Sequence, residues 1–219
     1  MMMEEKERKK TLSLEEIIKR AEDSELNKNF LISANYYFMI FTTHIDKIVT
    51  LKDKLNEIQT KFIFSTILLP ENNQKERMLL FLIQNENLNI FKFKPLLEKF
   101  AKFQLVYIED LNELLKIKPK NYKDINFEKA LFEHNIYSLS KVFENISFDS
   151  AEKFFKMKID LILNYTLKMI VENKIKASID EKRKFIILEK ENSINLNFDK
   201  QIQNFCLKTK NLVEFIKSH

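Results

Sequence analysis

Residues 133–157 read EHNIYSLSKVFENISFDSAEKFFKM, and residues 158–189 continue as KIDLILNYTLKMIVENKIKASIDEKRKFIILE. Together they predict three helices followed by two short strands. In the first strand, Ile175, Ala177 and Ile179 alternate with polar residues; an EKRK turn and the run FIILE follow. This is the pattern of a short antiparallel hairpin. Three helices that lead into such a hairpin have the element order of a winged helix.

Local signals place the ends of these helices. The first helix is expected over residues 125–145. Ser147 then provides an N-cap for a short helix over residues 148–157, and Asp149 lies in its first turn, where a carboxylate suits the positive helix end. The third helix should end at Asn173, because asparagine tolerates the left-handed conformation that a glycine usually takes there. The residues expected on the buried face of the third helix are Ile159, Ile162, Leu163, Thr166, Leu167, Ile170 and Val171.

The first half of the chain predicts short helices in series. Ser13 and Glu16 form a capping box at the start of the first helix. Residues 46–69 carry apolar side chains at three- and four-residue steps and predict one long amphipathic helix. Pro70 closes it, and further short helices follow up to about residue 117. Stacked helical hairpins of this size are typical of an α-solenoid, so residues 1–124 are predicted to form a helical-repeat segment.

Composition excludes several classes of function. The 219 residues include no glycine, so a glycine-rich phosphate loop or dinucleotide fingerprint is excluded, and no cofactor is expected. The single cysteine, Cys206, has no internal partner for a disulfide, and the N-terminus lacks a secretory signal pattern. An intracellular protein without a membrane span is therefore expected.

A DNA-binding role is the usual alternative for a winged helix. The third helix would enter the major groove, and its predicted outward residues are Asp160, Asn164, Lys168 and Glu172. Two carboxylates against one lysine, with no arginine to read guanine, disfavour contact with nucleic acid. The net charge of +5 is also spread over 37 basic and 32 acidic residues. Protein contact is the better interpretation, with nucleic-acid binding as a less favoured one.

No catalytic or metal site is predicted. His44, His134 and His219 are isolated from one another in the sequence, so the convergent ligands of a zinc hydrolase are missing. His134 is interpreted as a packed or capping histidine. Cys206 lies between Phe205 and Leu207, where a buried thiol is more common than a nucleophile. The chain is therefore not expected to be an enzyme.

The end of the chain carries an apolar stripe. Residues 191–219 predict one helix, and its apolar positions follow alternating steps of four and three residues, as in a coiled coil or helix bundle. Such a stripe packs either against partner chains or back on its own domain. The stripe consists of Phe198, Ile202, Phe205, Thr209, Leu212 and Ile216.

Four segments resemble the PCI-domain family. They are STILLPENNQKERMLLFLIQNEN (65–87), LFEHNIYSLSKVFENISFDSAEKFF (131–155), MIVENKIKASIDEKRKFIILE (169–189) and DKQIQNFCLKTKNLVEFI (199–216). EHNI is shared with a subunit of the proteasome lid, whereas the DKQIQ-x-x-C tail favours the COP9 signalosome. Family members carry a longer helical arm, and they place glycines near positions where this chain has Asn173 and Arg183.

The resemblance implies a mainly α protein: a helical-repeat segment (1–124), a winged-helix part of a PCI domain (125–190) and a C-terminal bundle helix (191–219). It also implies a non-catalytic scaffold of a COP9 signalosome-like complex that removes the ubiquitin-like modifier from cullins, or alternatively of the proteasome lid. The implied partners are other PCI and MPN subunits and, indirectly, a cullin-RING ligase, in cytoplasm and nucleus; no nucleic acid or membrane is implied. The implied partner-binding residues are Ile175, Ala177, Ile179, Phe198, Ile202, Phe205, Leu212 and Ile216.

Overall fold

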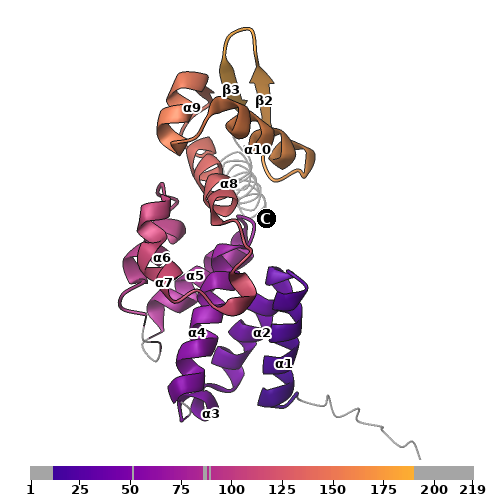
Figure 1. Cartoon of the computed structure of the whole chain (residues 1–219), viewed down its shortest axis with the longest axis vertical. Coiled ribbons are helices and arrows are strands. Elements are labelled where there is room, and N and C mark those ends of the chain that lie inside the picture. Colours follow the sequence, from indigo (N-terminus) through magenta and orange to yellow (C-terminus); the bar gives the residue numbers. More distant parts are fainter. Residues whose placement is uncertain (1–11, 51, 86–87, 89, 190–219) are drawn as a thin grey trace, which may run out of the picture.

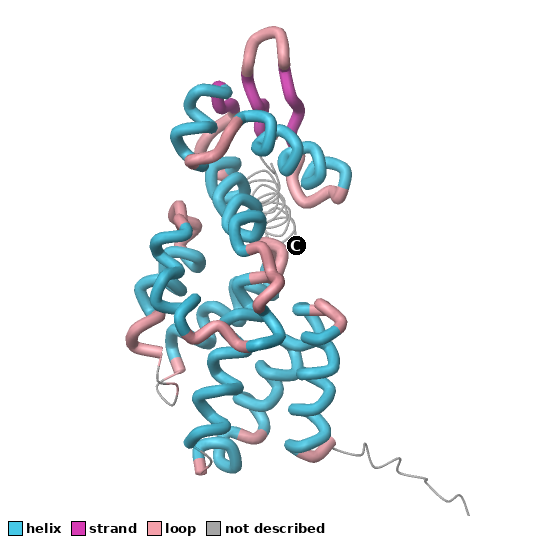
Figure 2. The backbone as a smooth tube through the Cα atoms, in the orientation of Figure 1, coloured by secondary structure: helices cyan, strands magenta, loops and turns pink. Residues whose placement is uncertain are grey.

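The computed structural model describes residues 12–50, 52–85, 88 and 90–189. Within them the chain is mainly helical, with a helical array at one end and a small sheet at the other, as Figure 1 and Figure 2 show. The helix α8 connects the two ends. The predicted fold class, a helical array followed by a winged helix, is confirmed. The predicted C-terminal bundle helix lies outside the described residues.

The array consists of short helices in which neighbours along the chain pack together. At its start the predicted capping box is confirmed: Ser13 Oγ accepts from the Glu16 N–H at 3.2 Å, and Glu16 Oε2 accepts from the Ser13 N–H at 2.9 Å. The α-helices are α1 (Leu14–Leu26), α2 (Phe30–Thr43), α3 (Ile45–Val49), α4 (Lys52–Ile67), α5 (Asn73–Gln84), α6 (Lys94–Ala101) and α7 (Asn112–Lys116). Two 3-10 turns, η1 (Ile108–Leu111) and η2 (Lys120–Tyr122), flank α7.

The prediction of one helix over residues 46–69 is wrong. α3 ends at Val49, and a separate helix, α4, begins at Lys52. At the break, Thr50 Oγ1 donates to the Lys47 carbonyl at 2.7 Å, a local bond that competes with continued helical pairing. The apolar spacing continues across the break, because Ile48 in α3 and Ile58 in α4 are buried in the same core.

A buried polar network joins η2 to the array. Glu25 is only 1% exposed, and its carboxylate accepts from the hydroxyls of Tyr37 at 2.8 Å and Tyr122 at 2.6 Å. Asn121 Nδ2 donates to its second oxygen at 2.9 Å. Burial, and after it the charge of Glu25, raise the pKa of both tyrosines, so both remain hydroxyl donors. The network fixes the segment that enters α8.

α8 (Phe127–Ser140) belongs to two hydrophobic cores. Leu131 packs in the core of the array, and the next residue, Phe132, packs in the core of the winged helix. Phe132 packs against Phe155, with ring centroids 4.7 Å apart and ring planes tilted by 47°. The two cores therefore meet inside α8, and the expected domain boundary at residue 124 stays a prediction.

The winged helix contains a third strand that the sequence did not indicate. It consists of β1 (Asn145–Ser147), α9 (Phe148–Phe155), α10 (Ile159–Val171), β2 (Ala177–Asp180) and β3 (Phe185–Leu188), with antiparallel strand order β1-β3-β2. The helix predicted over residues 125–145 ends at Ser140, and β1 follows. Ile146 lies opposite Ile186 and is 3% exposed, so burial of this side chain favours the extended conformation.

Two local predictions are confirmed. Ser147 does cap α9, accepting from the Ser150 N–H at 3.2 Å. Asn173 is left-handed, with φ of 54°, as expected. In the turn of the hairpin the left-handed residue is Lys184, with φ of 60°. The preceding residue, Arg183, donates its N–H to Asp180 Oδ1 at 2.9 Å, and this bond closes the turn.

Among the described residues, no helix combines the length and the apolar character that crossing a membrane requires.

Candidate assembly interface

The sheet presents one edge at β2. Since β3 lies between β1 and β2, the far side of β2 pairs with no other strand in the described part of the chain. The side chains of Ile175, Ala177 and Ile179 turn inward: Ile175 is 8% exposed, and the other two pack against the winged-helix core. A partner at this edge would therefore meet the backbone of β2 and not these three side chains.

The register shows which backbone groups reach that edge. The Glu189 N–H donates to the Lys176 carbonyl at 2.9 Å, so residues 176 and 189 form a hydrogen-bonded pair. Ladder bonds alternate along an antiparallel pair, so Ser178, opposite Ile187, is bonded to β3 as well. The N–H and C=O of Ala177 and Ile179 then point away from β3. These groups are available for an added strand.

The outer face of α10 is more apolar than predicted. Leu167 and Val171 were expected on the buried face, but their side chains are 51% and 79% exposed, so that expectation is wrong. The inner face is formed by Ile162, Thr166 and Met169. The four polar residues predicted to point outward, Asp160, Asn164, Lys168 and Glu172, are all exposed. Apolar side chains next to carboxylates suit a protein partner better than DNA.

Three successive residues of α8 bind three different segments. Glu133 accepts from Lys174 Nζ, just after α10, at 3.0 and 3.1 Å. His134 contacts the loop between α4 and α5 and the segment after α6. Asn135 Oδ1 accepts from the Val106 N–H at 2.8 Å, and its Nδ2 donates to the Val106 carbonyl at 2.7 Å. The EHN part of the EHNI motif thus holds the array and the winged helix together.

His134 is a structural residue. It is fully buried, with Nδ1 at 2.9 Å from Glu71 Oε1 and Nε2 at 2.9 Å from the Gln104 carbonyl. Its ring also lies 4.5 Å from that of Phe100. His44 lies between α2 and α3, and among the described residues no three potential ligands group around a metal position. The expectation that His134 packs instead of binding a metal is consistent with these contacts.

Glu71 is the acceptor that His134 and Lys75 share. Lys75, 1% exposed, donates to Glu71 Oε1 at 2.5 Å and to the carbonyls of Ile67 and Leu69 at 3.1 Å each. Burial by itself would raise the pKa of Glu71, but the charge of Lys75 and the hydrogen bond from His134 outweigh it and hold this pKa below its ordinary value. Sequence reasoning did not find Glu71 and Lys75, although an i, i+4 Glu-Lys pair after Pro70 was a visible signal.

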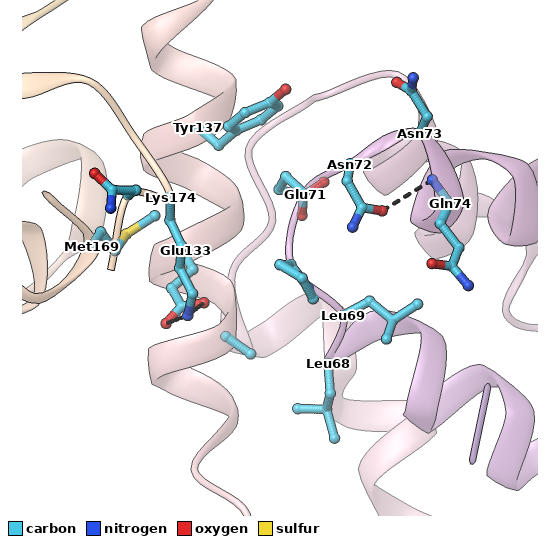
Figure 3. Close-up of a pocket in the computed structure, with 13 residues that line it drawn as sticks. Leu68, Leu69, Glu71, Asn72, Asn73, Gln74, Glu133, Tyr137, Met169 and Lys174 are labelled. Atoms are coloured by element: carbon cyan, nitrogen blue, oxygen red, sulfur yellow. Dashed lines mark hydrogen bonds and ion pairs between the residues drawn. The ribbon is translucent and has the colours of Figure 1, made fainter. Parts of the chain in front are cut away.

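A groove of about 530 Å³, here called the junction groove, lies between the array and the winged helix. Figure 3 shows Glu71 to Gln74 on one wall and Met169 and Lys174 on the other, with Glu133 and Tyr137 from α8 between them. Leu69 and Met169 are nearly buried beneath it. The amide side chains of Asn72, Asn73, Gln74 and Asn173 also line the groove, and more of its lining surface is polar than apolar.

The remaining predicted site residues lie outside the described residues. They are Phe198, Ile202, Phe205, Leu212 and Ile216, together with Cys206 and His219. The roles predicted for them stay predictions.

Comparison with known proteins is consistent with this architecture. Residues 113–190 match the PCI domain family. The matched range begins in α7 and includes α8, the winged helix and its sheet. The predicted resemblance to the PCI family is therefore confirmed.

Three curated relatives of this chain carry the same name. The chain is 26% identical over 126 residues to COP9 signalosome complex subunit 4 of Dictyostelium discoideum, a match covering 58% of this chain and 29% of the relative. For the subunit 4 proteins of Drosophila melanogaster and Arabidopsis thaliana the identities are 24% and 25%, covering 78% and 71% of this chain and 43% and 41% of the relatives. The chain thus matches less than half the length of each relative.

Proposed function

We propose that this protein is a non-catalytic scaffold subunit of a COP9 signalosome-like complex, which removes the ubiquitin-like modifier from cullins. Its partners would be other PCI subunits and MPN subunits, with a cullin-RING ligase as the indirect partner. The complex would act in cytoplasm and nucleus. The observation that carries the proposal is the PCI match over the winged helix, together with the three similar proteins named as signalosome subunit 4.

The free edge of β2 supports an assembly role. Backbone groups of Ala177 and Ile179 face away from β3, and a strand or loop of a neighbouring subunit could pair with them. The exposed side chains of Leu167 and Val171 on α10 offer further apolar surface on the same small domain. A scaffold needs such surfaces and needs no catalytic group.

The second proposed contact is the C-terminal stripe, which would join a bundle of helices from several subunits. Each large apolar side chain that becomes fully buried contributes roughly 2 kcal/mol before the cost of ordering. Phe198, Ile202, Phe205, Leu212 and Ile216 would together supply much of the anchoring free energy.

Affinity purification of the tagged chain from its own cells, followed by mass spectrometry, tests the proposal. We expect cullins, a deneddylase and other PCI subunits to co-purify, and we expect Ile202→Asp with Phe205→Asp to abolish this without changing the circular dichroism spectrum. Co-purification of proteasome ATPases instead would assign the chain to the lid. Recovery of nucleic acid with a steep salt dependence would favour DNA binding and contradict the scaffold.

A further inference from the structure

The described chain leaves the sheet close to the junction groove. After β3, the Glu189 N–H bonds to the Lys176 carbonyl, which places the exit point beside Lys176. Asn173 and Lys174, both of which line the groove, are at most three residues away, or roughly 11 Å along the backbone. Residues 190–197 could span roughly 25 Å more when extended. The apolar stripe that begins at Phe198 can therefore reach the groove without strain.

The groove and the segment that follows the exit point both combine apolar and amide side chains. At its floor the groove has Leu69 and Met169, 4% and 3% exposed, beside the ring of Tyr137, and polar groups, amides among them, make up more of its lining than apolar ones. In the sequence that follows the exit point, Phe198, Ile202 and Phe205 recur at steps of four and three residues, and Gln201, Gln203 and Asn204 lie between them. Apolar side chains could fill the floor while these amides pair with Asn72, Asn73 and Asn173.

We propose that, in the unassembled chain, residues 198–216 dock in cis into the junction groove and are withdrawn when partner subunits bind. The withdrawal rests on the proposed function, whereas the docking does not. Docking would cover the apolar stripe, which would otherwise be a site of nonspecific association. It would also tie the winged helix to the loop between α4 and α5 until partners compete for the stripe.

The single cysteine makes a direct test possible. A nitroxide attached to Cys206 in the full chain should selectively broaden the methyl signals of Met169, Leu69 and Ala130, which line the groove. The methyl groups of Ile48 serve as the reference, because α3 lies at the opposite end of the array from α8 (Figure 1). Ile202→Asp with Phe205→Asp should remove the broadening.

A second label position guards against disturbance by the label. Lys208→Cys in a Cys206→Ser background moves the nitroxide two residues along the same segment and should give the same pattern. Absence of broadening at the groove with both labels, or equal broadening at Ile48, overturns the proposal. Broadening between a spin-labelled chain and a separate isotope-labelled chain would mean that a second copy occupies the groove, which also overturns docking in cis.

The two proposals fail in different ways. If no groove signal is broadened but the signalosome subunits still co-purify, docking in cis is wrong and the proposed function stands. If the groove signals are broadened but no such subunits co-purify, docking stands and the proposed function is wrong. Addition of purified partner subunits to the spin-labelled chain should restore the groove signals, and persistence of the broadening in the assembled complex would overturn the withdrawal.

Discussion

Asn135 bonds both backbone groups of a single residue, Val106: its Oδ1 accepts from the Val106 N–H at 2.8 Å, and its Nδ2 donates to the Val106 carbonyl at 2.7 Å. Val106 is fully buried, so Asn135 takes the place of a strand partner. Asn135→Ala would leave two buried backbone groups unsatisfied, and we expect it to lower the free energy of unfolding by about 2–4 kcal/mol. Urea denaturation measures this.

The matched control for this prediction is Asn164→Ala, the same change at an exposed position of α10. It should alter the free energy of unfolding by no more than about 0.5 kcal/mol. Equal effects of the two substitutions would mean that the bonds to Val106 contribute little.

Lys75→Met removes the cation that neutralises Glu71 and donates hydrogen bonds to the carbonyls of Ile67 and Leu69. A buried carboxylate that loses its partner is costly, so we expect a destabilisation of about 3–5 kcal/mol. Lys102→Met breaks an exposed pair with Glu98 and should cost at most about 1 kcal/mol. Thermal and urea unfolding of both variants test the contrast; a Lys75→Met protein as stable as the parent would contradict the buried pair.

Stability should decline in acid partly through Glu71. Its pKa in the folded chain is below the ordinary value of 4.5, so its contribution is fully present above about pH 4.5 and is lost as the pH falls through the folded pKa. Glu71→Gln should therefore be less stable than the parent at neutral pH, with a difference that shrinks in acid. Urea midpoints across this pH range measure the difference, and a difference that stays constant or grows toward low pH would disprove the assignment.

Proline substitutions can separate the two sides of β2. Ala177→Pro removes an N–H that points to the free edge, at the first residue of a strand, where proline is tolerated. We expect the melting temperature to change little while partner subunits are lost from the purified complex. Ser178→Pro removes an N–H bonded to β3 and should instead destabilise the winged helix. Undiminished co-purification with Ala177→Pro would show that partners do not use this edge.

The two faces of α10 can be distinguished by truncation to alanine. Met169 is 3% exposed and Val171 is 79% exposed. Met169→Ala should cost about 2–4 kcal/mol because it creates a cavity, whereas Val171→Ala should stay within about 0.5 kcal/mol. Chemical denaturation of the two variants gives the comparison. A reversed order would contradict the helix orientation.

Local sequence signals predicted the features that depend on neighbouring residues. The capping box at Ser13, the cap at Ser147 and the left-handed Asn173 each follow from a side chain and backbone groups at most a few residues away. The order of helices and hairpin follows from apolar periodicity, and it was enough to indicate the winged helix and the resemblance to the PCI family. These features can be predicted from the sequence because short-range contacts determine them.

Long-range packing decided what the sequence left open. Periodicity placed Leu167 and Val171 inward, since it reports apolar spacing but not which neighbours are present to cover a face. β1 is a strand only because Ile146 pairs opposite Ile186, forty residues later in the chain. The hydrogen bonds of Asn135 to Val106 join residues 29 positions apart. The contact of His134 with Glu71 joins residues 63 positions apart. The sequence by itself determined the elements and their order, whereas only the tertiary structure decided how α8 joins the array to the winged helix, because those contacts form between segments that carry no local signal for each other.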